Sequence, residues 1–150
     1  MLDVLVISIS TPLKIGLYEN NVLVKTYEID GKTSDVLPNI FQEIIEKFKI
    51  NRIFYVNSPG SYMAIKVAYV FLKTVSITKK LDFFATSGFY FNNNSPIKAL
   101  GKKYFTNVNG EIVIDFLKEN EKIEEFVLPK ELNEKIFSKD TLPIYNLPAV

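Results

Sequence analysis

The chain of 150 residues contains no cysteine, no histidine and no tryptophan. Without cysteine it can form no disulfide and no thiolate metal site, and it has no thiol nucleophile. Without histidine it lacks the commonest general base near neutral pH and the commonest zinc ligand, which excludes a Ser-His-Asp triad. These absences point away from an enzyme and towards a subunit that binds a partner.

Charge is balanced, with 18 lysines and arginines against 17 acidic residues and a net charge of +1. The pairs Lys79–Lys80 and Lys102–Lys103 are interpreted as solvated loop charges, so tight nucleic-acid binding is not predicted. The apolar run that begins at Met63 is broken by Lys66 and Lys73, well short of the roughly 20 residues that span a bilayer. The sequence therefore predicts a cytoplasmic protein with no membrane-spanning segment and no metal.

Hydrophobic periodicity predicts an α/β fold with a mixed sheet. The run from Val4 to Ile9 is continuously apolar, which is typical of a strand covered on both faces. The remaining elements are predicted from apolar residues that recur at the spacing of a helix or alternate as in a strand. The predicted order is β-β-β-α-β-α-β, with strands at 4–9, 14–19, 22–29, 53–56 and 81–84 and helices at about 33–48 and 60–78.

The pattern loosens after residue 84. Asn109-Gly110 lies between two strand-like runs and is a strong hairpin signal. A further strand is expected at 124–128 and a short helix at 129–137. The segment 142–148 is expected to be an extended tail that packs through its apolar residues.

The turn Ser58-Pro59-Gly60-Ser61 separates the fourth strand from the second helix. Ser58, Gly60 and Ser61 form a candidate anion or nucleotide loop, because the N–H groups at the start of a helix attract negative charge. The alternative is a turn in which Ser61 or Ser58 only caps the helix. The turn has only one glycine and no lysine, which favours the capping interpretation over an anion-binding loop.

The second helix is apolar on more than one side. Its predicted sheet-facing residues are Ala64, Val67, Ala68, Phe71 and Val75. On the opposite side we predict a partner-binding face that consists of Tyr62, Ile65, Lys66, Tyr69 and Lys73. Two alternatives remain: the tyrosines lie flat while the lysines reach water, or the second half of the chain covers this face.

Five segments, taken in order, resemble the bacterial TsaB (YeaZ) family within the actin/sugar-kinase/Hsp70 superfamily of ribonuclease-H-like folds. The strongest is 58–68, Ser-Pro-Gly-Ser-Tyr-Met-Ala-Ile-Lys-Val-Ala, which is similar to the family's Gly-Pro-Gly-Ser-Phe-Thr-Gly-Leu-Arg-Ile-Gly. The others are 7–11, 34–38, 101–104 and 143–145. The resemblance implies an actin-like ATPase-type first lobe at 1–84 and a shortened second lobe at 85–150, with a hairpin and an extended C-terminal tail.

The sequence departs from the family pattern at informative positions. Ser8 replaces an aspartate that helps to bind metal and phosphate in the superfamily, and Ser58 and Ala64 replace two motif glycines. These changes weaken a nucleotide site, whereas a scaffolding role does not need those groups.

The resemblance implies a non-catalytic subunit that pairs with TsaD and, with TsaE and TsaC, supports threonylcarbamoyladenosine modification at position 37 of tRNA. It implies no cofactor bound by this chain alone, with ATP or ADP at the interface of the complex. Association of two copies of this chain through the same helices remains an alternative. The runner-up is a small ATP-dependent phosphotransferase or ATPase of the same superfamily.

Overall fold

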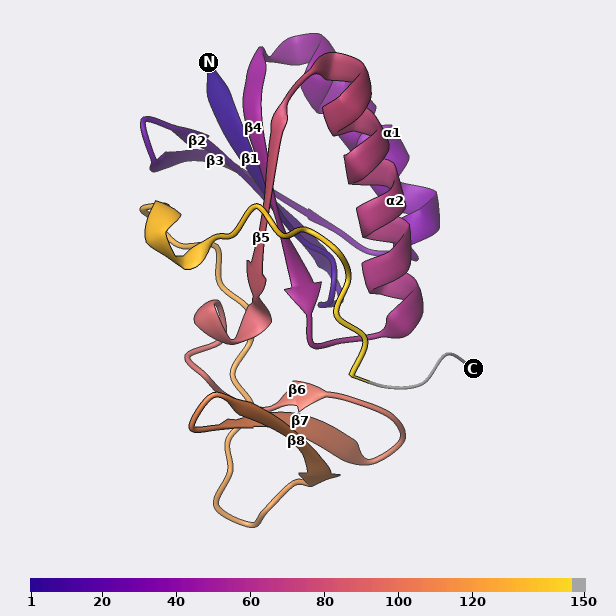
Figure 1. The fold of residues 1–150 in the computed structure, drawn as a ribbon, viewed down its shortest axis with the longest axis vertical. Helices are drawn as coiled ribbons and strands as arrows, with labels where there is room; N and C mark the ends of the chain where they lie inside the picture. Colours follow the sequence, from indigo (N-terminus) through magenta and orange to yellow (C-terminus); the bar gives the residue numbers. More distant parts are fainter. Residues whose placement is uncertain (147–150) are drawn as a thin grey trace.

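The structure, a computed structural model, describes residues 1–146 and is built around a five-stranded sheet (Figure 1). In space the strands lie in the order β3-β2-β1-β4-β5. The pairs β1–β4 and β4–β5 are parallel, whereas β2 is antiparallel to both of its neighbours. This mixed sheet confirms the predicted α/β class. Its strands are β1 (Leu2–Ile7), β2 (Leu13–Glu19), β3 (Val22–Ile29), β4 (Ile50–Ser58) and β5 (Asp82–Ser87).

Strand β1 is the middle strand, and both of its faces are buried. Val4 and Val6 belong to the cluster beneath the helices, whereas Leu5 and Ile7 belong to the cluster on the other face. This alternation follows from the two-residue period of a strand. It explains why the sequence here is continuously apolar instead of alternating with polar residues.

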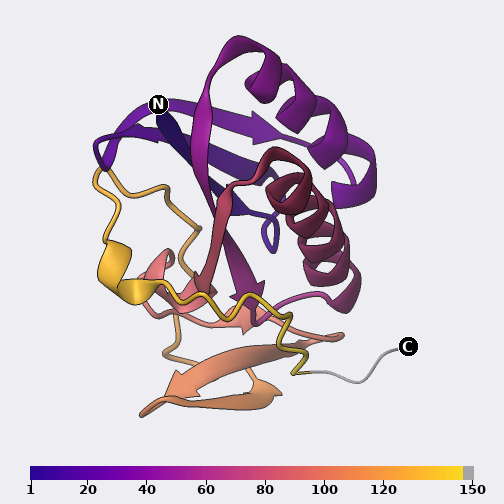
Figure 2. The ribbon, with the colours of Figure 1, turned by 45° about the horizontal axis from the view of Figure 1, so that its top comes forward.

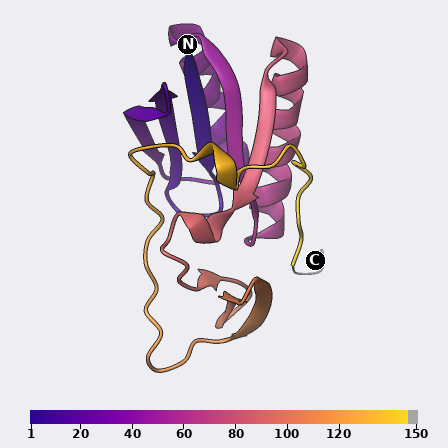
Figure 3. The same ribbon diagram turned by 60° about the vertical axis from the view of Figure 1, so that its left-hand side comes forward.

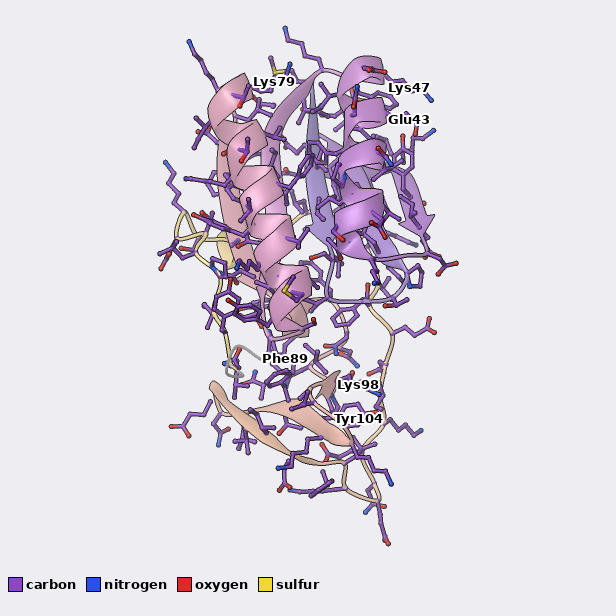
Figure 4. All side chains as sticks on the ribbon, turned by 90° about the vertical axis from the view of Figure 1, so that its right-hand side faces the viewer. Glu43, Lys47, Lys79, Phe89, Lys98 and Tyr104 are labelled. Carbon is purple, nitrogen blue, oxygen red and sulfur yellow. The ribbon has the colours of Figure 1, made fainter. Side chains whose placement is uncertain are left out.

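Two helices, α1 (Thr33–Lys47) and α2 (Tyr62–Lys79), cover one face of the sheet side by side (Figures 1 and 2). Phe41 of α1 meets Phe71 of α2 edge to face, with ring centroids 5.7 Å apart. Figure 4 places Lys47 and Lys79, in the last turns of the two helices, together at the end away from the small lower sheet. Both helices therefore begin at the end nearest that sheet.

The second face of the large sheet is covered by the strap, which we define as residues 126–138 (Figures 1 and 3). At one edge of the sheet, the N–H of Leu132 donates to the carbonyl of Asn21 at 2.8 Å. At the other edge, Ala85 and Ser138 exchange two backbone hydrogen bonds of 2.9 and 2.8 Å. The side chain of Leu132, at the first anchor, is buried in a cluster with Leu5, Ile7, Tyr18, Phe54, Val56 and Phe91.

A smaller antiparallel sheet lies below the large one (Figure 2). It consists of β6 (Ile97–Lys98), β7 (Lys103–Val108) and β8 (Glu111–Phe116), and it follows the short 3-10 helix η1 (Gly88–Tyr90). Asn109 and Gly110 both have positive φ values, of 53° and 89°, in the turn between β7 and β8. The predicted hairpin is therefore confirmed, and the reason is the left-handed backbone that these two residue types tolerate.

The structure corrects the expectation for residues 124–137. Instead of a strand followed by a helix, it has an irregular chain with one 3-10 turn, η2 (Glu134–Ile136). The apolar residues that suggested regular structure are in fact the strap's contacts with the large sheet. Leu147 and Pro148, the end of the expected tail, lie outside the described residues. The division of the chain at residue 84 stays a prediction.

Candidate partner-binding surface

The turn between β4 and α2 is built for packing and capping. The Ser61 side chain accepts a hydrogen bond from the N–H of Ala64 at 3.5 Å, so Ser61 is the N-cap of α2. A side chain at Gly60 would place its Cβ 2.6 Å from Ile9 Cγ2, which explains the glycine as a point of close approach. Ser58 lies at the end of β4, where it is buried opposite Ser87 of β5.

The three residues of the candidate anion loop are not brought together in one cavity. Ser58 lines a cavity of about 410 Å³ that faces the small sheet. Ser61 lines a different cavity, of about 680 Å³, beside the start of α1. Gly60 packs against Ile9. The cap interpretation is therefore confirmed for Ser61, whereas a single loop that encloses an anion does not form from these three residues.

Helix α2 is rotated from its predicted orientation. Its buried residues are Ile65, Ala68, Leu72 and Ser76. The predicted partner-binding face included Ile65, and this prediction is wrong, because Ile65 is fully buried under the helix. The sequence is ambiguous here because apolar residues occur on more than one side of the helix.

The two tyrosines of the predicted face are half-buried by the protein itself. The Tyr62 ring packs on Tyr145 of the C-terminal segment, with centroids 4.4 Å apart. Tyr69 lies near the rings of Tyr55 and Phe83, at 6.4 Å from each. The alternative that the second half of the chain covers this face therefore holds for Tyr62.

The two lysines of that face differ in their surroundings. Lys66 is exposed, and its ammonium lies 5.7 Å from the centroid of the Tyr62 ring. Lys73 is half-buried and lines a small cavity together with Lys139 and Thr141. Of the five predicted contact residues, Lys66 is thus the one that α2 presents openly to solvent. Whether any of them binds a partner stays a prediction.

A different set of apolar side chains is exposed on α2. Met63, Val70 and Ile77 are 60%, 54% and 67% exposed. They recur every seven residues, and an α-helix brings residues at this spacing back to nearly the same face. We call these three residues the α2 stripe. The predicted partner-binding face did not include these residues, although their seven-residue spacing is visible in the sequence.

Both helices carry exposed charged residues. Exposed acids on α1 are Asp35, Glu43 and Glu46, whereas exposed lysines on α2 include Lys66 and Lys79. Lys47 donates to Glu43 at 2.8 Å within α1, and this hydrogen bond lowers the pKa of Glu43. The α2 stripe is thus an apolar seam with exposed lysines on its own helix, whereas Glu43 lies near Lys25 and Tyr27 of β3, on the side of α1 away from α2 (Figure 4).

Two further findings concern the described part of the chain. Between residues 1 and 146, no three His, Cys, Asp or Glu side chains gather in a way that could hold a metal ion. No helix within the same range combines the length and the apolar character that crossing a membrane requires.

Comparison with known proteins establishes the class of fold first. A scan against protein-family models finds no match, and a search of curated proteins finds none. Solved structures do match, with TM-scores that show a shared fold. The likeness is thus visible in three dimensions, where the sequence comparisons find nothing.

One match is YeaZ from Pseudomonas aeruginosa, with a TM-score of 0.60 and 10% identity over 76% of this chain and 63% of that one. Another is an uncharacterized protein with similarity to peptidase YeaZ from Pseudomonas aeruginosa. Its TM-score is 0.56, with 11% identity and the same coverage. The chain thus spans about 63% of the length of these structures. The resemblance to YeaZ proteins is confirmed at the level of the fold.

Proposed function

We propose that this chain is a non-catalytic subunit that pairs through α1 and α2 with a TsaD-type protein. In that role it would support threonylcarbamoyladenosine modification at position 37 of tRNA in the cytoplasm. The YeaZ fold supports the proposal, but a fold alone does not define a function. The observation that carries the proposal is the α2 stripe.

The geometry of the α2 stripe suits a helical partner. Helices that pack along one another at a shallow crossing angle carry apolar residues at two positions of each seven-residue repeat, and the α2 stripe supplies one of these positions. Val70 lies in the middle of α2, with Met63 and Ile77 one heptad away on each side. Together they offer a seam about four turns long, which matches the length over which two helices of this size can remain in contact.

The charges beside the α2 stripe supply specificity. A partner whose helix carries acidic groups opposite the exposed lysines of α2 would complement this surface. A partner with lysine or arginine at those positions would place like charges together. Complementary charges of this kind guide orientation and association rate more than they add affinity.

The experiment is co-expression of the chain with the TsaD homologue from its own genome, followed by size-exclusion chromatography. We expect a stoichiometric complex. Val70→Asp should abolish co-elution, because it places a charge in the centre of the apolar seam. Val108→Asp is the matched control, since Val108 is similarly exposed, at 53%, but lies on β7. Separate elution of the wild-type chains would contradict the proposal.

The homodimer is measured in the same series. Light scattering on the isolated wild-type chain distinguishes a monomer of 17.2 kDa from a dimer. If a dimer forms through the α2 stripe, Val70→Asp should return it to the monomer while Val108→Asp should not. A dimer that survives Val70→Asp would show that copies associate through another surface.

A further inference from the structure

A cavity of about 310 Å³ lies between the chain that follows η1 and the segment that leads into the strap. Its polar side chains are those of Asn92, Asn93, Glu124 and Glu125, together with the hydroxyl of Tyr90. None of the described lining residues is a lysine or an arginine. Because ionised carboxylates can only accept, and amide oxygens also accept, this wall favours a cation over an anion.

Asn92 supplies an independent observation. It lines the cavity and is 2% exposed, and its Nδ2 donates to the carbonyl of Ser95 at 2.9 Å. Its Oδ1, however, has no hydrogen-bond partner within the described chain. Buried side-chain oxygens in folded proteins nearly always have a partner. An amide oxygen that is held in place in this way, and that no donor reaches, is a group that a cation can satisfy.

Hydrogen bonds between segments distant in the sequence hold the two walls of the cavity together. The N–H of Val127 donates to the carbonyl of Phe91 at 2.8 Å, and the N–H of Glu124 donates to Ser95 Oγ at 3.0 Å. Asn93 Nδ2 donates to Glu124 Oε2 at 3.0 Å. Carboxylates that bind metal ions commonly accept a second hydrogen bond of this kind, which orients them. The Glu124 carboxylate is therefore positioned before any ligand arrives.

The two glutamates have no counter-charge of their own. Neither Glu124 nor Glu125 forms a salt bridge with a lysine or arginine among residues 1–146. Both also line a neighbouring cavity that includes Lys14 and Lys98. Lys14 is already engaged there, because its ammonium donates to the carbonyl of Phe126 at 2.6 Å, and Lys98 is exposed. The two adjacent negative charges therefore repel each other unless a cation lies between them.

We propose that this cavity binds one hard divalent cation, with calcium preferred over magnesium. Asn92 Oδ1 and carboxylate oxygens of Glu124 and Glu125 bind the ion, and water completes its coordination. Calcium accepts about six to eight oxygens in a flexible arrangement, whereas magnesium requires a near-ideal octahedron that an open site with two glutamates does not impose.

The bound ion joins the chain after η1 to the segment that leads into the strap. It thereby adds a cross-link to the hydrogen bonds that already connect these two segments. The site needs only two carboxylates, so it is compatible with the finding that no three acidic side chains gather in the described chain. The inference does not depend on the proposed partner, and it departs from the expectation that the chain holds no metal.

The test is a titration of the isolated chain with calcium chloride and, separately, with magnesium chloride. Both are added to metal-free buffer at constant ionic strength and followed by amide NMR shifts. We expect saturable shifts at Asn92, Asn93, Glu124 and Glu125, with half-saturation by calcium at about 0.1–1 mM, the weak end of the range for calcium sites in proteins. Magnesium should bind more weakly. Shifts that do not saturate, or that are as large at the exposed acids of α1, would overturn the proposal.

Three variants separate a site from a general charge effect. Glu124→Gln and Glu125→Gln should each weaken calcium binding by about tenfold, because each removes one charged ligand. Glu119→Gln makes the same charge change at an exposed glutamate that does not line the cavity, and it should leave the affinity unchanged. Equal losses in all three variants would show non-specific attraction of calcium to surface charge and overturn the site.

Tyr90 provides a second readout of where the ion lies. The chain has no tryptophan, so the emission of Tb³⁺ bound in place of calcium is excited through a nearby tyrosine. We expect this emission to disappear when calcium is added. Tyr90→Phe should lose most of it and keep the affinity for calcium, whereas Tyr27→Phe, on β3, should change neither. Emission that is unaltered by Tyr90→Phe would place the ion elsewhere and overturn the assignment.

Asn92→Asp distinguishes a ligand from a purely structural amide. It keeps the shape of the side chain but replaces the donor to Ser95 with an oxygen, so the urea midpoint without calcium should fall. Calcium should bind this variant several-fold more tightly than the wild type, because a third carboxylate joins the ligands, and should raise the midpoint by more. If affinity and midpoint respond to calcium no more than in the wild type, Asn92 belongs to the fold alone and the proposal is wrong.

Discussion

The ring of Tyr145 lies against the ring of Tyr62, with centroids 4.4 Å apart, although the two residues are 83 positions apart in the chain. This contact brings the C-terminal segment to the first turn of α2. The carbonyl of Leu142 accepts from the Asn57 side chain at 3.0 Å, and the N–H of Ile144 donates to the carbonyl of Asn57 at 3.2 Å. Residues 142–145 are therefore held beside the turn from which α2 begins.

We predict that Tyr145→Ala lowers the free energy of unfolding by about 0.5–1.5 kcal/mol, the range measured for aromatic pairs. The value stays small because Tyr145 is itself partly exposed, at 41%. Urea denaturation measures it. Tyr90→Ala is the control, because Tyr90 is more exposed, at 60%, and lies on η1. Equal losses in the two variants would show that the ring pair contributes nothing.

Leu132→Ala tests whether the strap is part of the core. Leu132 is buried against the face of the sheet that carries Leu5 and Ile7. Truncation of a buried leucine costs about 2–5 kcal/mol, so we expect a loss in that range by urea denaturation. Leu100→Ala, at an exposed leucine, should cost far less. A small loss for Leu132→Ala would mean that the strap is only loosely attached.

The large sheet was predictable because its signals are local. The continuous apolar run at 4–9 predicted a strand buried on both faces, and β1 (Leu2–Ile7) is one, with a boundary shift of two residues. The Asn109-Gly110 turn was predictable for the same reason, since two adjacent residues determine it. Such features depend on neighbours in sequence and not on the rest of the fold.

The strap and the orientation of α2 were not predictable from local signals. Leu132 is buried mainly by residues more than 70 positions away, among them Leu5 and Phe54. Its neighbours Leu128 and Ile136 lie at helical spacing, which favoured a helix that the structure does not form. Which side of α2 faces the sheet was decided by packing, since Phe71 meets Phe41 of α1 and Tyr62 is covered by Tyr145. For this reason the candidate partner-binding surface is the α2 stripe and does not include Ile65.

Arg52, the only arginine of the chain, joins the sheet to the strap. It donates to Asp3 at 2.6 Å and also to Glu134, and its guanidinium lies 5.1 Å from the Phe54 ring. Arg52→Met should cost about 3 kcal/mol or more, because it leaves the buried Asp3 carboxylate unpaired.

The double variant Asp3→Asn with Arg52→Met should recover part of that loss, since it removes the uncompensated charge. Arg52→Lys should give an intermediate loss, because lysine keeps the charge but not the forked set of donors. Urea denaturation of the four proteins measures these values. If Arg52→Met is no less stable than the double variant, the unpaired charge of Asp3 is not the cause of the loss.

Glu134 makes the attachment of the strap dependent on pH. The pKa of Glu134 lies below its ordinary value of 4.5, mainly because Arg52 donates a hydrogen bond to its carboxylate and to a lesser extent because Asn21 donates one. A carboxylate with a lowered pKa stabilises the fold above its ordinary pKa, and the stabilisation is lost as the pH falls through the lowered value. The effect is small, at most about 1 kcal/mol, because the Glu134 side chain is 50% exposed.

The measurement is the hydrogen-exchange protection factor of the Leu132 N–H, which bonds to Asn21 beside this ion pair. In the wild type we expect protection to be constant near neutral pH and to fall below pH 4.5, the ordinary pKa of Glu134. Glu134→Gln should show lower protection at neutral pH and no such fall. Glu43→Gln removes another carboxylate with a lowered pKa, but on α1, and should leave the wild-type profile unchanged. A profile for Glu134→Gln that follows the wild type would show that other acids release the strap.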